Sequence, residues 1–127
     1  MPGMDPWRKP EAEMADRFHE AAAGIEGLDI RRMFGFPAGF IGGNMAVGLH
    51  QDTLIVRLPE DERRERLEQG WHQFEPMPGR PMREYLALPE AVAADATEAR
   101  RWMERAAAYV RTLPPKAPKA AKKPKRV

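Results

Sequence analysis

The sequence contains no cysteine and no serine. Without thiols there is no disulfide, no thiolate nucleophile and no cysteine-bound metal, and without serine the Gly-x-Ser-x-Gly elbow of hydrolases is excluded. No apolar run approaches the roughly 18 residues of a membrane span, and the first residues lack the basic and apolar pattern of a signal peptide. We therefore expect a cytoplasmic protein that does not associate with membranes.

An excess of positive charge is found only in the C-terminal segment. Without that segment's six cations, the 21 basic residues fall to 15 against 19 acidic ones, a net charge of −4. Several prolines interrupt regular backbone hydrogen bonding in the same segment, and it carries no large apolar side chain before Val127. We predict an N-terminal arm at residues 1–10, one domain at 11–113 and a disordered basic tail at 114–127. The tail cations are Lys116, Lys119, Lys122, Lys123, Lys125 and Arg126.

Apolar residues recur at helical spacing near both ends of the domain. The first set predicts a helix over residues 11–25, and the second predicts a helix over about 96–112, with Asp95 and Glu98 as a capping-box variant. Trp102 and Met103 are expected to anchor the last helix in the core. A charged segment over residues 59–69 predicts a short surface helix that ends at Gly70.

Short β-favouring runs fill the region between the helices. Strands are predicted at residues 30–36, 39–41, 45–49 and 53–58, with turns at 37–38, 42–44 and 51–52. Two further strands, at 71–74 and 83–88, flank a proline-rich loop. The fold class is therefore α+β, with an antiparallel sheet of about five to six strands packed by the N- and C-terminal helices. The predicted order is one helix, four strands, one helix, two strands and one helix.

Four short blocks together resemble the N-terminal domain of the TfoX/Sxy competence regulators: Arg32-Met33-Phe34-Gly35, Gly43-Asn44-Met45-Ala46, Gly79-Arg80-Pro81-Met82, and Tyr85 with Leu88-Pro89-Glu90. The resemblance implies a two-layer fold akin to secretion chaperones and a regulatory role connected with the activation of DNA-uptake genes. The resemblance assigns no catalytic or ligand-binding residue to this chain. The blocks are expected to be structural, with Gly35, Gly43 and Gly79 at positive φ or at points of close backbone approach. Phe34, Met45 and Met82 are expected in the core.

The chain also departs from the family pattern. Phe36-Pro37-Ala38-Gly39 stands where a glycine-rich stretch is usual, and Arg80 stands where lysine is usual. The chain carries no counterpart of the second domain of full-length regulators. A role in competence itself is therefore not expected.

Residue types that could catalyse a reaction or bind a ligand occur in patterns typical of structural roles. His19, His50 and His72 form no spaced metal-ligand pair, so we expect no metal. The acids of residues 60–68 alternate with arginines, which is typical of a solvated helix face. The glycines between 39 and 43 lack the spacing of a phosphate-binding loop, and the Arg32–Phe36 run lacks the pattern of an RNA-binding strand. We expect no catalytic residue and no cofactor.

Three functional hypotheses stay open at this stage. The first is a regulatory module that binds a protein partner or a second copy, while the tail contacts DNA phosphates without reading sequence. The second is an interaction or chaperone-like domain with no nucleic-acid role, which leaves the tail as a solubilising extension. The third is a small-molecule binder or small enzyme with a pocket between sheet and helices, lined by Phe34, Phe36, Tyr85 and Trp102.

Overall fold

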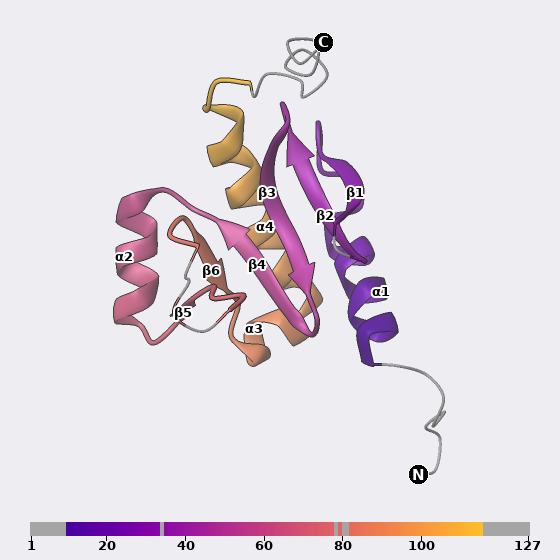
Figure 1. The fold of residues 1–127 in the computed structure, drawn as a ribbon, viewed down its shortest axis with the longest axis horizontal. Coiled ribbons are helices and arrows are strands. Elements are labelled where there is room, and N and C mark those ends of the chain that lie inside the picture. Colours follow the sequence, from indigo (N-terminus) through magenta and orange to yellow (C-terminus); the bar gives the residue numbers. More distant parts are fainter. Residues whose placement is uncertain (1–9, 34, 78, 80–81, 116–127) are drawn as a thin grey trace, which may run out of the picture.

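Six strands form one antiparallel sheet in the computed structural model, which describes residues 10–33, 35–77, 79 and 82–115. The spatial order is β1-β2-β3-β4-β6-β5, so that β1 and β5 are the two edges (Figure 1). The predicted α+β class and antiparallel sheet are confirmed. The strands are β1 (Asp29–Met33), β2 (Phe36–Ile41), β3 (Asn44–His50), β4 (Thr53–Arg57), β5 (His72–Gln73) and β6 (Tyr85–Ala87).

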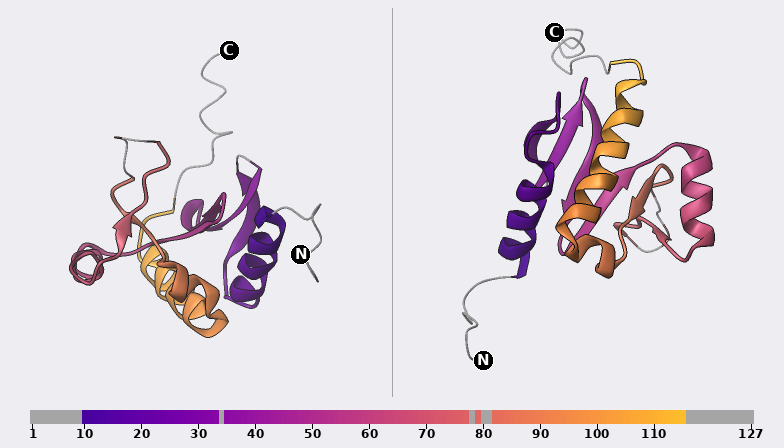
Figure 2. Two further views of the ribbon diagram at one scale, coloured as in Figure 1. Left: turned by 90° about the horizontal axis from the view of Figure 1, so that it is seen from below. Right: turned by 180° about the vertical axis from the view of Figure 1, so that it is seen from behind.

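Helices α1 (Pro10–Ala22) and α4 (Ala96–Arg111) cover one face of this sheet (Figure 2). The Asp95 carboxylate begins α4 by accepting hydrogen bonds from the backbone N–H groups of Thr97 and Glu98, as the sequence predicted. Helix α2 (Glu60–Glu68) lies beside β5 at the sheet edge (Figure 1). Within the described residues, no helix is long and apolar enough to cross a membrane.

The main core lies between the sheet and the helices. Alternate strand residues, including Val47, Val56 and Leu86, point toward the helices and are fully buried. Met103 meets them at 0% exposure and Trp102 at 5%, which confirms both predicted anchors. Each large apolar side chain buried in this way contributes about 1.5–3 kcal/mol to folding. The helix-side core therefore holds the two layers together.

No helix of the described residues lies over the opposite face of the sheet. Residues 74–77 and 82–84 fold above this face instead (Figure 2, left). Phe74 of this segment forms a second, smaller apolar cluster with Ala38, Met45 and Ile55 of the sheet. We call this side of the sheet the open face.

Some predicted boundaries were wrong. Pro37 and Ala38 were expected to form a turn, but they belong to β2, and Pro37 lies opposite Arg32 in the ladder. The turn includes Gly35, whose φ of 83° favours glycine. A short helix, α3 (Glu90–Ala94), was not predicted at all. The last two strands are shorter than expected, at residues 72–73 and 85–87.

Candidate functional site

Two small residues lie side by side in the middle of the open face. Ala38 of β2 is paired with Gly48 of β3, and Gly48 is paired with Ile55 of β4. A Cβ atom added at Gly48 would lie 3.4 Å from Ile55 Cδ1 and 3.7 Å from Met45 Sδ. Because neither small residue fills the space above it, the sheet surface is hollowed at this point.

A cavity of about 310 Å³ lies over this hollow, and we call it the methionine pocket. Four of the six methionines in the described part of the chain line it. Met45 is 8% exposed, whereas Met77 is 60% exposed. The lining residues are Met33, Ala38, Met45, Gly48, Leu49, His50, Ile55, Phe74, Pro76, Met77 and Met82.

His50 carries the one polar side chain among the described residues that line this pocket. Its ring lies 5.9 Å from the Phe36 ring and 5.4 Å from the Phe74 ring, measured between centroids. The structure shows no hydrogen bond between the half-buried His50 ring and another described residue. An imidazole always offers a hydrogen-bond donor, and a neutral one also offers an acceptor. The pocket is therefore apolar with a single polar group.

Backbone hydrogen bonds fix the loop that forms the far wall of the pocket. The Phe74 N–H donates to the Tyr85 carbonyl at 2.8 Å, and the Met82 N–H donates to the Phe74 carbonyl at 2.8 Å. The Gln73 side chain adds a bond to the Arg83 carbonyl at 2.9 Å. These bonds close both ends of the segment that carries Met77.

Tyr85 ties this loop to the sheet. Its hydroxyl donates to the Met45 carbonyl at 3.1 Å, and its ring lies under the Arg57 guanidinium at 5.5 Å. Arg57 in turn pairs with Glu84 at 2.7 Å. Burial raises the pKa of Tyr85 above its ordinary value of 10.0, and the nearby Arg57 charge opposes that rise.

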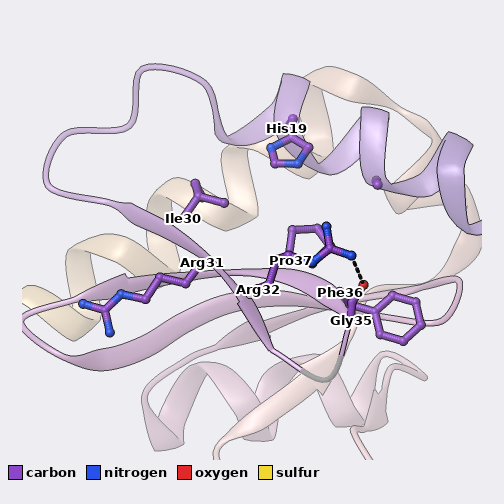
Figure 3. Close-up of a pocket in the computed structure, with 8 residues that line it drawn as sticks. His19, Ile30, Arg31, Arg32, Gly35, Phe36 and Pro37 are labelled. Atoms are coloured by element: carbon purple, nitrogen blue, oxygen red, sulfur yellow. Dashed lines mark hydrogen bonds between the residues drawn. The ribbon is translucent and has the colours of Figure 1, made fainter.

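A second cleft, of about 440 Å³, lies between α1 and the β1–β2 hairpin. Figure 3 shows His19 of α1 and Ile30 of β1 beside this cleft, whereas the Arg31 side chain extends away from His19. Arg31 already pairs with Asp29 at 2.8 Å, and Arg32 donates to the Gly35 carbonyl at 3.2 Å. Because these exposed cations have partners in the chain itself, we regard the cleft as ordinary solvated surface.

The structure describes most of the block residues, including three methionines and three glycines. Met33, Met45 and Met82 line the methionine pocket. Met45 is buried in the smaller core cluster, as predicted, whereas Met82 was predicted as core and is only half-buried. The three block glycines confirm the prediction of positive φ, at 83°, 85° and 79° for Gly35, Gly43 and Gly79. Phe34, Arg80, Pro81 and the tail cations at 116–126 lie outside the described residues.

Asn44 has a role that the sequence did not suggest. Its amide donates to the Pro114 carbonyl at 2.9 Å, so the β2–β3 turn holds the chain where the predicted tail begins. A Cβ atom at the neighbouring Gly42 would lie 3.6 Å from Pro115. The tail therefore starts from a fixed point on the fold.

The pocket expected between the sheet and the helices does not assemble from the three of its predicted residues that the structure describes. Trp102 belongs to the helix-side core, and Tyr85 packs against the cluster on the open face. Phe36 packs against the helix-side core, and its ring also contacts His50. Gly48 and Ala38, which make the hollow, were not identified from the sequence, because only strand pairing brings them together.

The histidines likewise lie on separate elements, α1, β3 and β5. In the part of the chain that the structure describes, no group of three or more His, Asp or Glu side chains could hold a metal ion.

The fold and the pocket together define a small α+β domain with one helix-covered sheet face and one open face. The sequence model of the family described as TfoX N-terminal domain matches residues 20–110, so the chain belongs to this family. The match spans all six strands and therefore every lining residue of the methionine pocket. No curated protein and no solved structure matches the chain significantly. Family membership suggests a regulatory module.

Proposed function

We propose that the protein is a non-enzymatic regulatory module that acts by binding an apolar group in the methionine pocket. The pocket itself carries this proposal, because ligand sites are typically concave and mostly apolar, with few polar groups. Methionine side chains are flexible and polarisable, and they recur at surfaces that adapt to bound partners. His50 carries the one polar side chain among the described lining residues, so these residues offer no pair of groups for acid–base chemistry.

The test uses an uncharged dye, N-phenyl-1-naphthylamine, whose fluorescence rises in apolar surroundings. The intact protein should enhance its emission, and Gly48→Val should abolish the enhancement because the added side chain occupies the floor of the pocket. Ala108→Val, at an exposed position of α4, adds the same side chain elsewhere and should leave dye binding unchanged. Equal enhancement by the protein and by a well-folded Gly48→Val variant would contradict the proposal.

The basic tail supplies the second part of the proposed function, which is non-specific affinity for DNA. The tail has six cationic residues and no acidic residue, whereas the rest of the chain has a net charge of −4. Such a segment can neutralise phosphates without reading bases. Because Asn44 holds Pro114, the tail leaves the folded domain beside the β2–β3 turn.

A salt series of fluorescence anisotropy tests the tail. If all six cations contact phosphates, the log-log slope of affinity against salt should be about −5 for duplex DNA. A chain with glutamine at all six positions keeps its length and should lose the binding. Absence of binding by the intact chain at low salt would remove the DNA role and leave the tail as a solubilising extension.

The exposed β1 edge favours self-association as a second candidate function. β1 ends the sheet, and its side chains from Asp29 to Arg32 are exposed. Edge strands pair readily with another strand, so we propose a homodimer through β1. Sedimentation velocity should show a dimer that Arg32→Pro converts to monomer. Arg32 lies opposite Pro37, which has no N–H, so the Arg32 N–H is directed to the free edge, where proline cannot donate. A monomer at all concentrations would exclude this candidate.

A further inference from the structure

We infer that the methionine pocket binds a free small molecule that carries an aromatic ring and one hydrogen-bonding group. This inference rests on the proposed function and narrows it, since any apolar group would satisfy that proposal. Three observations carry it: the identity of the side chains in the wall, the position of His50, and the size and cover of the cavity.

The wall chemistry favours an aromatic ring over an aliphatic group. Four thioether side chains line a single cavity, and sulfur contacts with the edge of an aromatic ring are favourable beyond simple burial. Phe74 also lines the cavity, and its ring meets that of His50 in a T-shaped arrangement with an interplanar angle of 69°. A bound ring would add further edge-to-face contacts of the same kind. An aliphatic ligand would gain binding free energy only from the burial of its apolar surface.

The single polar group requires a matching group on the ligand. The His50 ring lies between Phe36 and Phe74, at 5.9 and 5.4 Å, in a cavity whose other described lining side chains are apolar. A polar group that loses water without gaining a hydrogen bond is costly. A ligand with one hydroxyl or similar group would satisfy the imidazole as it enters.

The cavity suits a free molecule. Its volume of about 310 Å³ is near the lower end of the usual range for ligand pockets, roughly 300–1,000 Å³. The hydrogen-bonded loop places Pro76, Met77 and Met82 across from the sheet. A group that enters under this loop is covered from two sides, which favours a compact molecule over a side chain attached to a bulky partner.

Competition against the bound dye tests the inference. The competitors are toluene, phenol, methylcyclohexane and N-acetylphenylalaninamide. A merely apolar pocket would bind methylcyclohexane at least as tightly as toluene, because the saturated ring is the more hydrophobic of the two. We expect toluene to displace the dye at a lower concentration than methylcyclohexane. N-acetylphenylalaninamide, which presents the same ring on a peptide unit, should compete more weakly than toluene.

A substitution at His50 tests the polar contact. His50→Phe keeps a ring between Phe36 and Phe74 and removes both ring nitrogens. Phenol should then lose about fivefold in affinity relative to toluene, the loss expected for one hydrogen bond. His72→Phe, on β5 and outside the described lining of the pocket, is the matched control and should leave the phenol-to-toluene ratio unchanged.

The outcomes separate the inference from the proposed function. Displacement by methylcyclohexane that equals or exceeds displacement by toluene, or a phenol-to-toluene ratio unaffected by His50→Phe, would overturn the inference while the pocket remained an apolar binding site. Stronger competition by N-acetylphenylalaninamide than by toluene would assign the pocket to a partner's side chain and also overturn it. Failure of the dye and of every competitor to bind would overturn the proposed function as well.

Discussion

At the scale of single residues, two strand glycines have different reasons to lack a side chain. A Cβ atom at Gly39 would lie 2.8 Å from Leu28 Cδ1 and 2.9 Å from Val47 Cγ2, on the helix-covered side. A Cβ atom at Gly48 meets its nearest neighbours at 3.4 Å, on the open face. The first glycine permits close packing, and the second leaves space for a ligand.

Alanine substitution at the two positions should therefore give different results. Gly39→Ala forces Leu28 and Val47 apart, and we expect a loss of about 1–3 kcal/mol in the free energy of unfolding. Gly48→Ala makes ordinary contacts and reduces the flexibility of the unfolded chain, so its cost should stay below about 0.5 kcal/mol. Urea unfolding of both variants measures the difference. Similar destabilisation by the two changes would show that the open face is as tightly packed as the core.

Tyr85 makes stability depend on alkaline pH. Because burial raises the pKa of Tyr85 above 10.0, the folded state favours the neutral phenol. This contribution is complete below the unfolded value near pH 10 and is lost as the pH rises through the folded pKa. Urea unfolding at about pH 8 and pH 11 should show a larger loss for the wild-type protein than for Tyr85→Phe. An equal loss in both would contradict the role of burial.

At the scale of elements, α2 is held to the domain by contacts unlike those of the other long helices. None of its side chains is buried. Instead, Arg66 lies 4.9 Å from the centroid of the buried Trp102 ring, which Trp71 meets edge-on at 5.1 Å. Glu62 accepts a hydrogen bond from Arg105 of α4 at 2.9 Å. A cation over an aromatic face contributes about 0.5–2 kcal/mol and an exposed ion pair less, so α2 should be the first helix to open.

Hydrogen exchange tests this attachment. Amides of α2 should exchange faster than those of α4, since local opening follows the number of buried contacts. Arg66→Ala should raise the α2 exchange rates by a further factor of about five, equivalent to the loss of roughly 1 kcal/mol. Arg64→Ala, at an exposed position on the same helix, is the control. Equal effects from both variants would mean that Trp102 does not anchor α2.

Some helices and strands could be predicted from sequence patterns alone, and others could not. The helix that contains Trp102 was predicted almost to its ends, because its apolar spacing and the Asp95 cap are local signals. The strand containing Pro37 was not, because proline and alanine favour a turn and only pairing with β1 and β3 places them in a ladder. The short α3 lacks the length at which periodicity becomes visible.

At the scale of the whole molecule, one face of the sheet packs in the main core and the other face carries the proposed binding pocket. The helix-covered face carries most of the buried apolar side chains, and the open face carries the pocket. Apart from the short α3, the order of elements could be predicted from local periodicity. The pocket could not, because it depends on the pairing of Ala38 with Gly48 and on a loop that folds back over them. Met33, Met45 and Met82 were identified as shared family residues, but their sequence positions do not show that they meet.

Methionine-methyl NMR during a toluene titration tests the central claim, that binding occurs on the open face, most directly. Ring-current shifts should appear at Met33, Met45, Met77 and Met82, and Gly48→Val should remove them. Met14 and Met103, which pack on the helix side, should not shift and serve as internal controls. Shifts at Met14 and Met103, with the four pocket methyls unchanged, would place binding between sheet and helices and contradict the account.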